Sequence, residues 1–266
     1  MIKKIILALL LFPLFALAQS EQYYVTFVKG VVVLQRTKQP LKPGDKLSSD
    51  DKLQFKDKTC KLTCISPGKG RFEISADQTK PNSDGELYAV LKSNLLPVAN
   101  TYHLSTRSLM FEGYEPKTYF RSEETQNRIL LLTDQALPIV SSYKIASGNF
   151  FFVQYQLNGK TITKKVEHTD KGLLFIPALF EDASGTIHTE KVMLCYQSKE
   201  TGTARSSVLA EFIPVLATST NIKEQIALVS KYTVSTDKKI RNTEIASHIF
   251  SNYGKIGLEE LANLSQ

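Results

Sequence analysis

The chain has 266 residues and carries 33 Lys and Arg against 26 Asp and Glu, a formal net charge of +7. Hydrophobic residues make up 42% and charged residues 22% of the composition, which is ordinary for a globular protein. These figures exclude collagen-like, intrinsically disordered and disulfide-scaffold proteins. The length accommodates one large domain or two smaller ones.

Residues 1–18 have the features of a secretory signal peptide. Lys3 and Lys4 precede an apolar run of 14 residues, IILALLLFPLFALA, which has small residues at positions 16 and 18. A helix that spans a bilayer needs about 20 apolar residues, and Pro13 interrupts this run. We therefore expect cleavage after Ala18, export to the periplasm or cell surface, and no stable membrane span afterwards; an uncleaved anchor is the alternative.

The chain expected after cleavage keeps a mild basic excess. Loss of Lys3 and Lys4 leaves 31 basic against 26 acidic residues, a net charge of +5. The densest basic clusters, 164–165 and 238–241, have no interleaved aromatic residues, so no nucleic-acid partner is predicted. We expect these clusters to be solvated surface, and binding of anionic wall polymers is the weaker alternative.

Residues 19–97 show short strands separated by turns. The strand-like runs are 23–34, 50–55, 59–65 and 71–75. Gly30 interrupts the first run, as at a sharp bend, and turn sequences begin at Gln39 (QPLKPGDKL) and Ser66 (SPGKG). Strands at about ten-residue spacing predict a mainly β domain, a small β barrel or sandwich.

Four segments of this region form a series: VKGVV from Val28, LKPGDKL from Leu41, DKLQF from Asp51 and SPGKGRF from Ser66. The series resembles FecR-type, small-barrel modules of the cell envelope, and the start of uncharacterised exported Bacteroidetes proteins. The resemblance covers about the first third of the chain. It implies a β architecture and a role in binding other envelope proteins or wall polymers.

The basic loops of this first domain are the predicted contact site. Lys42 and Lys46 lie in one turn, and Lys69 and Arg71 lie in and just after the next. Cations on exposed turns would attract anionic polymers or acidic proteins.

Residues 98–127 are interpreted as a connector that packs on a domain, because they retain several aromatic and aliphatic residues. A second β series follows in residues 128–216. Its strongest signal is Asn158-Gly159 between FFFVQYQL and KTITKKV, since a two-residue hairpin needs positive φ at both turn positions. We also expect a hairpin between 172–180 and 187–196 and a last strand at 208–215. Several short antiparallel strands predict an immunoglobulin-like sandwich, although the chain contains no Trp.

Residues 217–266 change to a helical period and predict a short helical tail. Ile222, Ile226 and Val229 recur at helical spacing after a capping sequence at 220–221. A second helix is expected to begin at 242 or 243 and to end at Gly254. Leucines at 258, 261 and 264 form a third stripe. We expect these faces to be core contacts rather than partner grooves.

The three cysteines give no clear disulfide or metal site. Cys60 and Cys64 lie four residues apart on a predicted strand, which separates them by about 13 Å. A disulfide needs Cα atoms within about 7 Å, so we expect both thiols to be core residues. Cys195 could pair with either one only if two domains meet, and the sequence leaves that pairing open. No His lies near the C-x-x-x-C spacing, so no metal is predicted.

Catalytic motifs are missing from the sequence. It has no G-x-S-x-G, H-E-x-x-H, P-loop or Rossmann fingerprint. His188 and Cys195 would lie on opposite faces of one strand, whereas a pair of His168 with Cys195 stays open. We therefore predict no cofactor and a non-enzymatic binding or structural module. The alternatives are an envelope hydrolase without a short motif, and an accessory subunit that docks by its helical tail.

Overall fold

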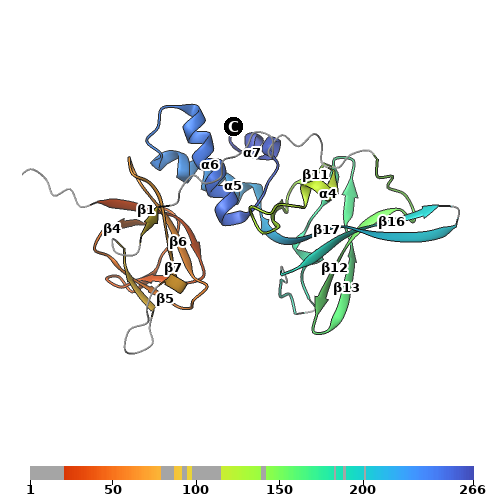
Figure 1. Cartoon of the computed structure of the whole chain (residues 1–266), viewed down its shortest axis with the longest axis horizontal. Coiled ribbons are helices and arrows are strands. Elements are labelled where there is room, and N and C mark those ends of the chain that lie inside the picture. The colour runs from red at the N-terminus through yellow and green to blue at the C-terminus, as the bar shows by residue number, and fades with distance from the viewer. Residues whose placement is uncertain are drawn as a thin grey trace, which may run out of the picture. The chain divides into compact units, whose positions relative to one another are not determined.

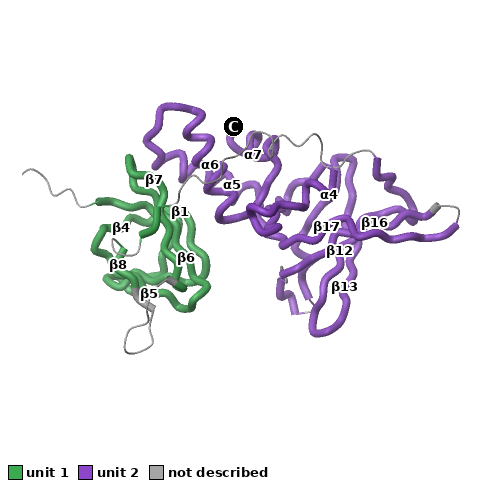
Figure 2. The backbone as a smooth tube through the Cα atoms, viewed as in Figure 1, with its two compact units in different colours: residues 1–97 green, residues 98–266 purple. Residues whose placement is uncertain are grey.

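The computed structural model of the chain describes residues 21–78, 87–91, 95–97, 115–138, 142–182, 184–187, 190–200 and 202–266 (Figure 1). The predicted signal peptide, most of the predicted connector and His188 lie outside these residues. The contacts divide the chain into two compact units, residues 1–97 and 98–266 (Figure 2). Several antiparallel sheets and C-terminal helices make up the structure, which confirms the mainly β class.

The first unit is built from two antiparallel sheets, with strand orders β4-β1-β6-β7-β9 and β3-β2-β5-β8. Their strands are β1 (Gln22–Lys29), β2 (Val32–Leu34), β3 (Gln39–Pro40), β4 (Lys46–Ser48), β5 (Lys52–Phe55), β6 (Lys61–Ser66), β7 (Gly70–Ser75), β8 (Leu87–Val90) and β9 (Leu96–Pro97). A 3-10 turn, η2 (Ala76–Gln78), follows β7. Gly30 carries the chain from β1 in one sheet to β2 in the other, which confirms the predicted bend.

Gly30 is required at this bend for two reasons. Its φ of +71° is in the left-handed region that favours glycine. A Cβ at this position would lie 2.6 Å from the Sγ atom of Cys60. The bend therefore packs directly against the core of the first unit.

Cys60 and Cys64 belong to this core, as predicted, together with side chains such as Val25, Leu53 and Leu62. All three cysteines of the chain are free. Burial raises the pKa of the Cys64 thiol to about 12. The Cys64 thiol therefore behaves as a small apolar side chain of the core, whereas the Sγ atom of Cys60 also donates to the carbonyl oxygen of Val31 at 3.5 Å and to Oδ2 of Asp57 at 3.4 Å.

The second unit contains a five-stranded sheet of order β10-β17-β16-β12-β13 and a three-stranded sheet of order β11-β15-β14. Its strands are β10 (Arg128–Leu132), β11 (Ala136–Leu137), β12 (Phe150–Leu157), β13 (Lys160–Lys165), β14 (Glu167–Thr169), β15 (Gly172–Leu174), β16 (Val192–Glu200) and β17 (Thr203–Ala217). β10 runs parallel to β17, and the other neighbouring strands are antiparallel.

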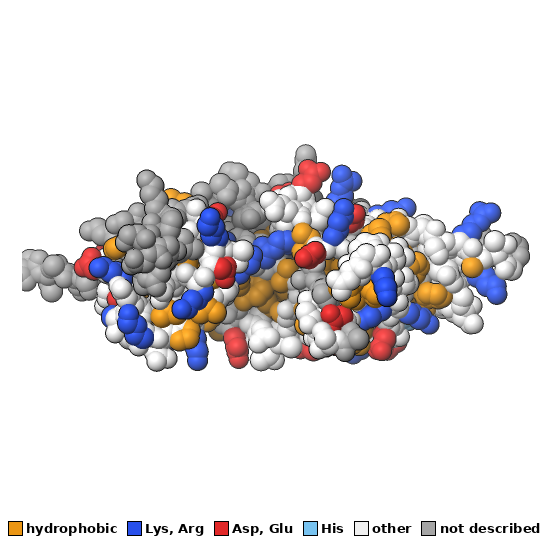
Figure 3. Space-filling view, turned by 90° about the horizontal axis from the view of Figure 1, so that it is seen from below, with side chains coloured by type: hydrophobic (Ala, Val, Ile, Leu, Met, Phe, Trp, Pro, Cys, Tyr) orange, Lys and Arg blue, Asp and Glu red, His pale blue; other side chains and the backbone are white. Residues whose placement is uncertain are grey.

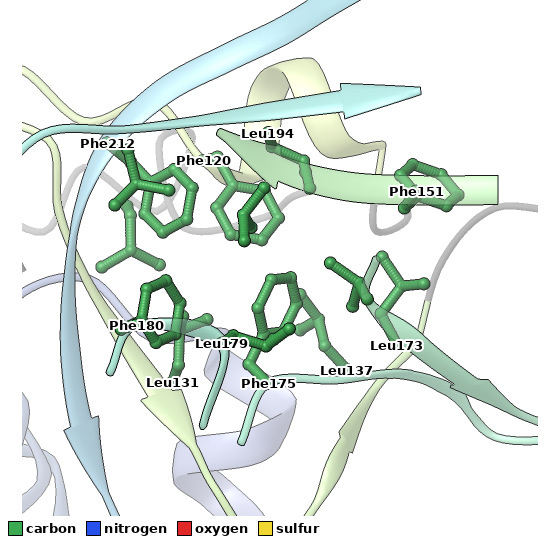
Figure 4. Close-up of a cluster of buried hydrophobic side chains, with 14 of the residues drawn as sticks. Phe120, Leu131, Leu137, Phe151, Leu173, Phe175, Leu179, Phe180, Leu194 and Phe212 are labelled. Carbon is green, nitrogen blue, oxygen red and sulfur yellow. The ribbon is translucent and has the colours of Figure 1, made fainter. Parts of the chain in front are cut away.

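Aromatic side chains dominate the core of the second unit, where the labelled rings and leucines point toward one another (Figure 4). The ring of Phe120 is fully buried, with its centroid 4.7 Å from that of Phe212 and 5.6 Å from that of Phe175. Phe120 follows the short helix α4 (Pro116–Tyr119). The end of the predicted connector is therefore part of the core.

The hairpin predictions had two outcomes. Asn158 and Gly159 have φ values of +50° and +74° and join β12 to β13, which confirms the first hairpin. The second, between 172–180 and 187–196, was wrong, because β15 pairs with β14 and β11 while β16 pairs with β12 and β17. Pro177 opens a 3-10 turn, η3 (Pro177–Leu179), soon after β15, and so ends the strand that the apolar run suggested.

Three helices form the tail: α5 (Ser219–Tyr232), α6 (Lys238–Tyr253) and α7 (Leu258–Leu264). Thr218 caps α5 by accepting from the N–H of Asn221. α6 begins at Lys238, four or five residues before the predicted start, because the side chain of Asp237 caps it. Gly254, at φ +105°, follows its end as predicted. Among the described residues, no helix combines the length and apolar character needed to cross a membrane.

The tail is joined to the five-stranded sheet through Lys255. The N–H of Lys255 donates to the carbonyl oxygen of Arg128 at 2.9 Å, and the N–H of Leu130 donates to the carbonyl oxygen of Lys255 at 2.8 Å. These bonds lie on the side of β10 that does not pair with β17. The tail therefore closes this edge of the sheet and belongs to the second unit.

Candidate functional site

The two predicted contact lysines of the first turn are exposed. Lys42 and Lys46 both lie on the surface of the first unit. The backbone N–H of Lys42 donates to Oδ2 of Asp45 at 2.8 Å, so the same turn also carries a carboxylate. The turn thus has mixed charge. On the face seen in Figure 3, Lys and Arg side chains are likewise scattered among acidic ones.

The structure places the other two predicted contact residues differently. Lys69 is exposed and forms an ion pair with Glu21. Arg71 is only 3% exposed, which contradicts its predicted place in a basic surface loop. Arg71 lies in the predicted strand, but it pairs with the buried Ile65 of β6 and its own side chain is buried too. Arg71 is therefore excluded from the contact surface.

A cleft in the second unit brings together polar and aromatic side chains at one corner of the sheets. We call it the β12–β14 cleft, and its volume is about 650 Å³. Its lining residues come from the loop before β12, the start of β12, and the connection from β13 to β14; they are Ile145, Ala146, Ser147, Phe150, Phe151, Lys165, Val166, Glu167 and His168.

The floor of the cleft forms where the chain passes from one sheet to the other. The N–H of Val166 donates to the carbonyl oxygen of Phe151 at 2.9 Å, just beyond the end of β13. Both side chains are buried. From Glu167 the chain continues as β14 in the three-stranded sheet. The floor is therefore set by backbone pairing and core packing.

The loop that forms the opposite wall is fastened to β16. The hydroxyl of Tyr196 donates to the carbonyl oxygen of Lys144 at 2.6 Å, and the N–H of Lys199 donates to Oδ1 of Asn149 at 2.6 Å. The ring of Tyr143 lies 5.1 Å from that of Phe151 and 5.0 Å from that of Tyr196, measured between centroids. These contacts fix the wall of the cleft before any ligand arrives.

Tyr143 also links this wall to the segment before α4. Its hydroxyl donates to Oε1 of Glu115 at 2.7 Å. Burial, followed by the hydrogen bond and charge of Glu115, raises the pKa of the Tyr143 hydroxyl far above its usual value. The phenol thus stays protonated and keeps donating at any physiological pH.

The rim of the cleft carries both charges beside an aromatic face. Nζ of Lys165 lies 5.1 Å from the centroid of the Phe150 ring, within the range of a cation–π contact. Glu167 and His168 are exposed on the same rim. The lining thus combines exposed charged and polar side chains with the half-buried ring of Phe150. The arrangement suits a ligand that combines an apolar group with a carboxylate.

The neighbouring Lys164 has a structural role instead. Its Nζ donates to the carbonyl oxygens of Ala178, at 2.6 Å, and Glu181, at 2.5 Å. It thereby ties β13 to η3. The prediction that this cluster is solvated surface is therefore wrong for the half-buried Lys164, whereas Lys165 is exposed as predicted.

The structure does not favour a cysteine nucleophile at this site. Cys195 is only 3% exposed, and burial raises the pKa of its thiol. Reactive cysteines have a lowered pKa and some exposure. His168 is exposed on β14 and belongs to the cleft. In the described part of the chain, no group of three or more His, Cys, Asp or Glu residues could hold a metal ion.

The sequence does not reveal the cleft because its residues come from two separate stretches, 145–151 and 165–168. The sequence pattern marks His168 only as a possible partner of Cys195, and Phe150 only as part of a strand. One signal was present: a basic residue, an acidic residue and a histidine follow one another closely in KKVEH, directly after a predicted strand.

Comparisons with models of known protein families, with curated proteins and with solved structures give no match. The FecR-like resemblance of the first unit therefore stays a prediction.

Proposed function

We propose that the protein is an exported, non-enzymatic binding module of the cell envelope, and that it holds its ligand in the β12–β14 cleft. The proposal rests on the signal-like first 18 residues and on the cleft geometry. It includes a FecR-like small barrel for the first unit and an immunoglobulin-like sandwich for the second. The expected partners are other envelope proteins, with anionic wall polymers as the weaker choice.

The choice of ligand rests on the contact between Lys165 and Phe150. The ammonium of Lys165 lies over the half-buried ring of Phe150, next to the core residues Phe151 and Val166. Lys165 covers one face of the Phe150 ring, so an apolar side chain of the ligand can pack beside the ring while a neighbouring carboxylate pairs with Lys165. A peptide segment with an acidic residue next to a leucine or an aromatic residue has this chemistry. The turn of Lys42 and Lys46 offers no comparable apolar contact.

A peptide titration tests this assignment. The probe is a fluorescent, capped peptide with a Leu-Glu pair between glycines, and a Leu-Lys peptide serves as the chemical control. Lys165→Glu and Phe150→Ala should each weaken binding of the Leu-Glu peptide about tenfold, equivalent to about 1.4 kcal/mol. Lys160→Glu is the matched variant, because it makes the same charge change on β13 outside the cleft.

Equal affinity of the Leu-Glu peptide for wild type, Lys165→Glu and Lys160→Glu would contradict the cleft assignment. The export part has a separate test. We expect a mature protein that begins near Gln19 in the periplasmic or surface fraction, identified by mass spectrometry of the N-terminal peptide. Full-length chain in the cytoplasm would contradict export and leave the cleft result standing.

A further inference from the structure

The strand β17 is much longer than its neighbour on one side. β16 pairs with it from Thr203 to Phe212, whereas β10 pairs only with residues 213–217. In the described parts of the chain, no strand pairs with the outer edge of β17 between 203 and 212. Half of the backbone N–H and C=O groups along this stretch therefore face away from the sheet.

A bulge divides this open edge. Leu194 pairs with Ala210 and Cys195 with Val208, so Leu209 is an extra residue in β17. Bulges end regular pairing on the strand that carries them. The regular open edge is therefore Thr203–Val208, all of whose residues are exposed. In Figure 1, β16 and β17 extend as an arm beyond the rest of their sheet.

Two side chains give this edge a specific chemistry. Val208 is 58% exposed, a large value for a β-branched residue on a strand. Arg205, the charged residue of the regular edge, is also exposed. The two lie three positions apart along the strand, so they point to opposite faces. A strand added to this edge would place one residue beside Arg205 on one face and another beside Val208 on the other face.

A second copy of the chain is a poor occupant because of charge. In an antiparallel pair of identical strands related by a two-fold axis, opposite side chains lie on the same face of the sheet only when one residue lies directly opposite its own copy. We call that residue the centre of the register. Centring on Arg205 sets two guanidinium groups directly opposite each other, and centring on Ala204 or Ser206 sets them diagonally, within reach of long side chains. Centring on Ser207 runs into the bulge. Like charges destabilise the first three registers, and an acidic strand would meet no such repulsion.

We propose that the edge Thr203–Val208 of β17 accepts an extended, acidic peptide segment from another protein by strand addition. In the antiparallel orientation, the more stable one per residue, a β-branched residue of the segment lies beside Val208. A Glu or Asp lies three residues later, beside Arg205. The segment therefore has the pattern Val-x-x-Glu. Its main-chain hydrogen bonds supply affinity, and its two side chains supply specificity.

The test uses the full chain and the capped peptide Val-Thr-Thr-Glu-Thr-Thr. Its control, Val-Thr-Glu-Thr-Thr-Thr, has the same composition but puts both recognition residues on one face. Residue-resolved hydrogen exchange should show that only the outward-facing amides of Thr203–Val208 slow down when the first peptide binds. Arg205→Glu should weaken its binding about fivefold.

A peptide with Lys in place of Glu should restore binding to the Arg205→Glu variant. Lys160→Glu is the matched control, since it makes the same charge change on β13, at the other end of the same sheet, and it should leave affinity unchanged. The exposed positions of Arg205 and Lys160 make folding insensitive to both changes. Equal binding of the two peptides, failure of the charge-swap rescue, or uniform slowing of all amides would each overturn the proposal.

Discussion

Lys255 is a buried cation that fastens the helical tail to the rest of the second unit. It is 4% exposed, and its Nζ donates to the carbonyl oxygens of Thr118, at 3.0 Å, and Arg121, at 2.8 Å. The same atom lies 5.6 Å from the centroid of the Tyr119 ring. Burial nevertheless dominates and lowers the pKa of Lys255 to about 8.

This lowered pKa makes stability depend on pH with a definite sign. In the unfolded chain the pKa of Lys255 returns to its ordinary value of 10.5. Between pH 8 and 10.5 the unfolded state therefore binds more protons than the folded state, and the free energy of unfolding rises with pH. A difference of about 2.5 pKa units corresponds to about 3 kcal/mol. Below pH 8, Lys255 is charged in both states, and its buried charge lowers the free energy of unfolding by the full amount.

The assay is urea unfolding of wild type and Lys255→Met at several pH values from 7 to 10.5. Other titrating groups cancel in the difference between the two proteins. From pH 7 to pH 10.5, the free energy of unfolding of wild type should rise by about 2–3 kcal/mol relative to that of Lys255→Met. Lys223→Met, an exposed lysine on α5, should show no such shift. A Lys255→Met difference that is flat or shifts the opposite way would refute the reasoning.

Three further substitutions test the packing of the second unit by chemical denaturation. Phe120→Ala should lower the free energy of unfolding by about 3–5 kcal/mol, because it empties the centre of the aromatic core; a loss below about 1 kcal/mol would contradict that placement. Gly254→Ala should cost about 2–3 kcal/mol, since a Cβ would lie 2.4 Å from the carbonyl oxygen of Arg128 at a φ of +105°. Thr218→Ala should cost about 1 kcal/mol through loss of the α5 cap, whereas Thr220→Ala, inside the helix, should change stability little.

The features that the sequence predicted well are those decided by local chemistry. Gly30 and Asn158-Gly159 adopt the backbone conformations that their residue types favour, and the strands on either side follow. The helical period of the tail and the stop at Gly254 are local in the same sense. The start of α6 could also have been predicted from the sequence, because Asp237 is a good capping residue directly before the helix.

The failures concern pairings between distant segments. An apolar run such as GLLFIPALF has no local feature that selects β14 and β11 over β16 as its partners. Arg71 follows a turn in the sequence, but the hairpin register already makes it a buried strand residue. The β12–β14 cleft depends on where the chain changes sheets, which is a property of topology rather than of any motif.

The position of Lys255 also bears on how the second unit is made. β10 obtains its two neighbours from residues 213–217 and from Lys255, more than eighty and more than a hundred residues further along. Such contacts form late, because a long loop must close before they can stabilise anything. During synthesis, both edges of β10 therefore stay unpaired until residues 213–217 and Lys255 have been made. A chaperone that binds the LLL segment of β10 would protect these edges until then.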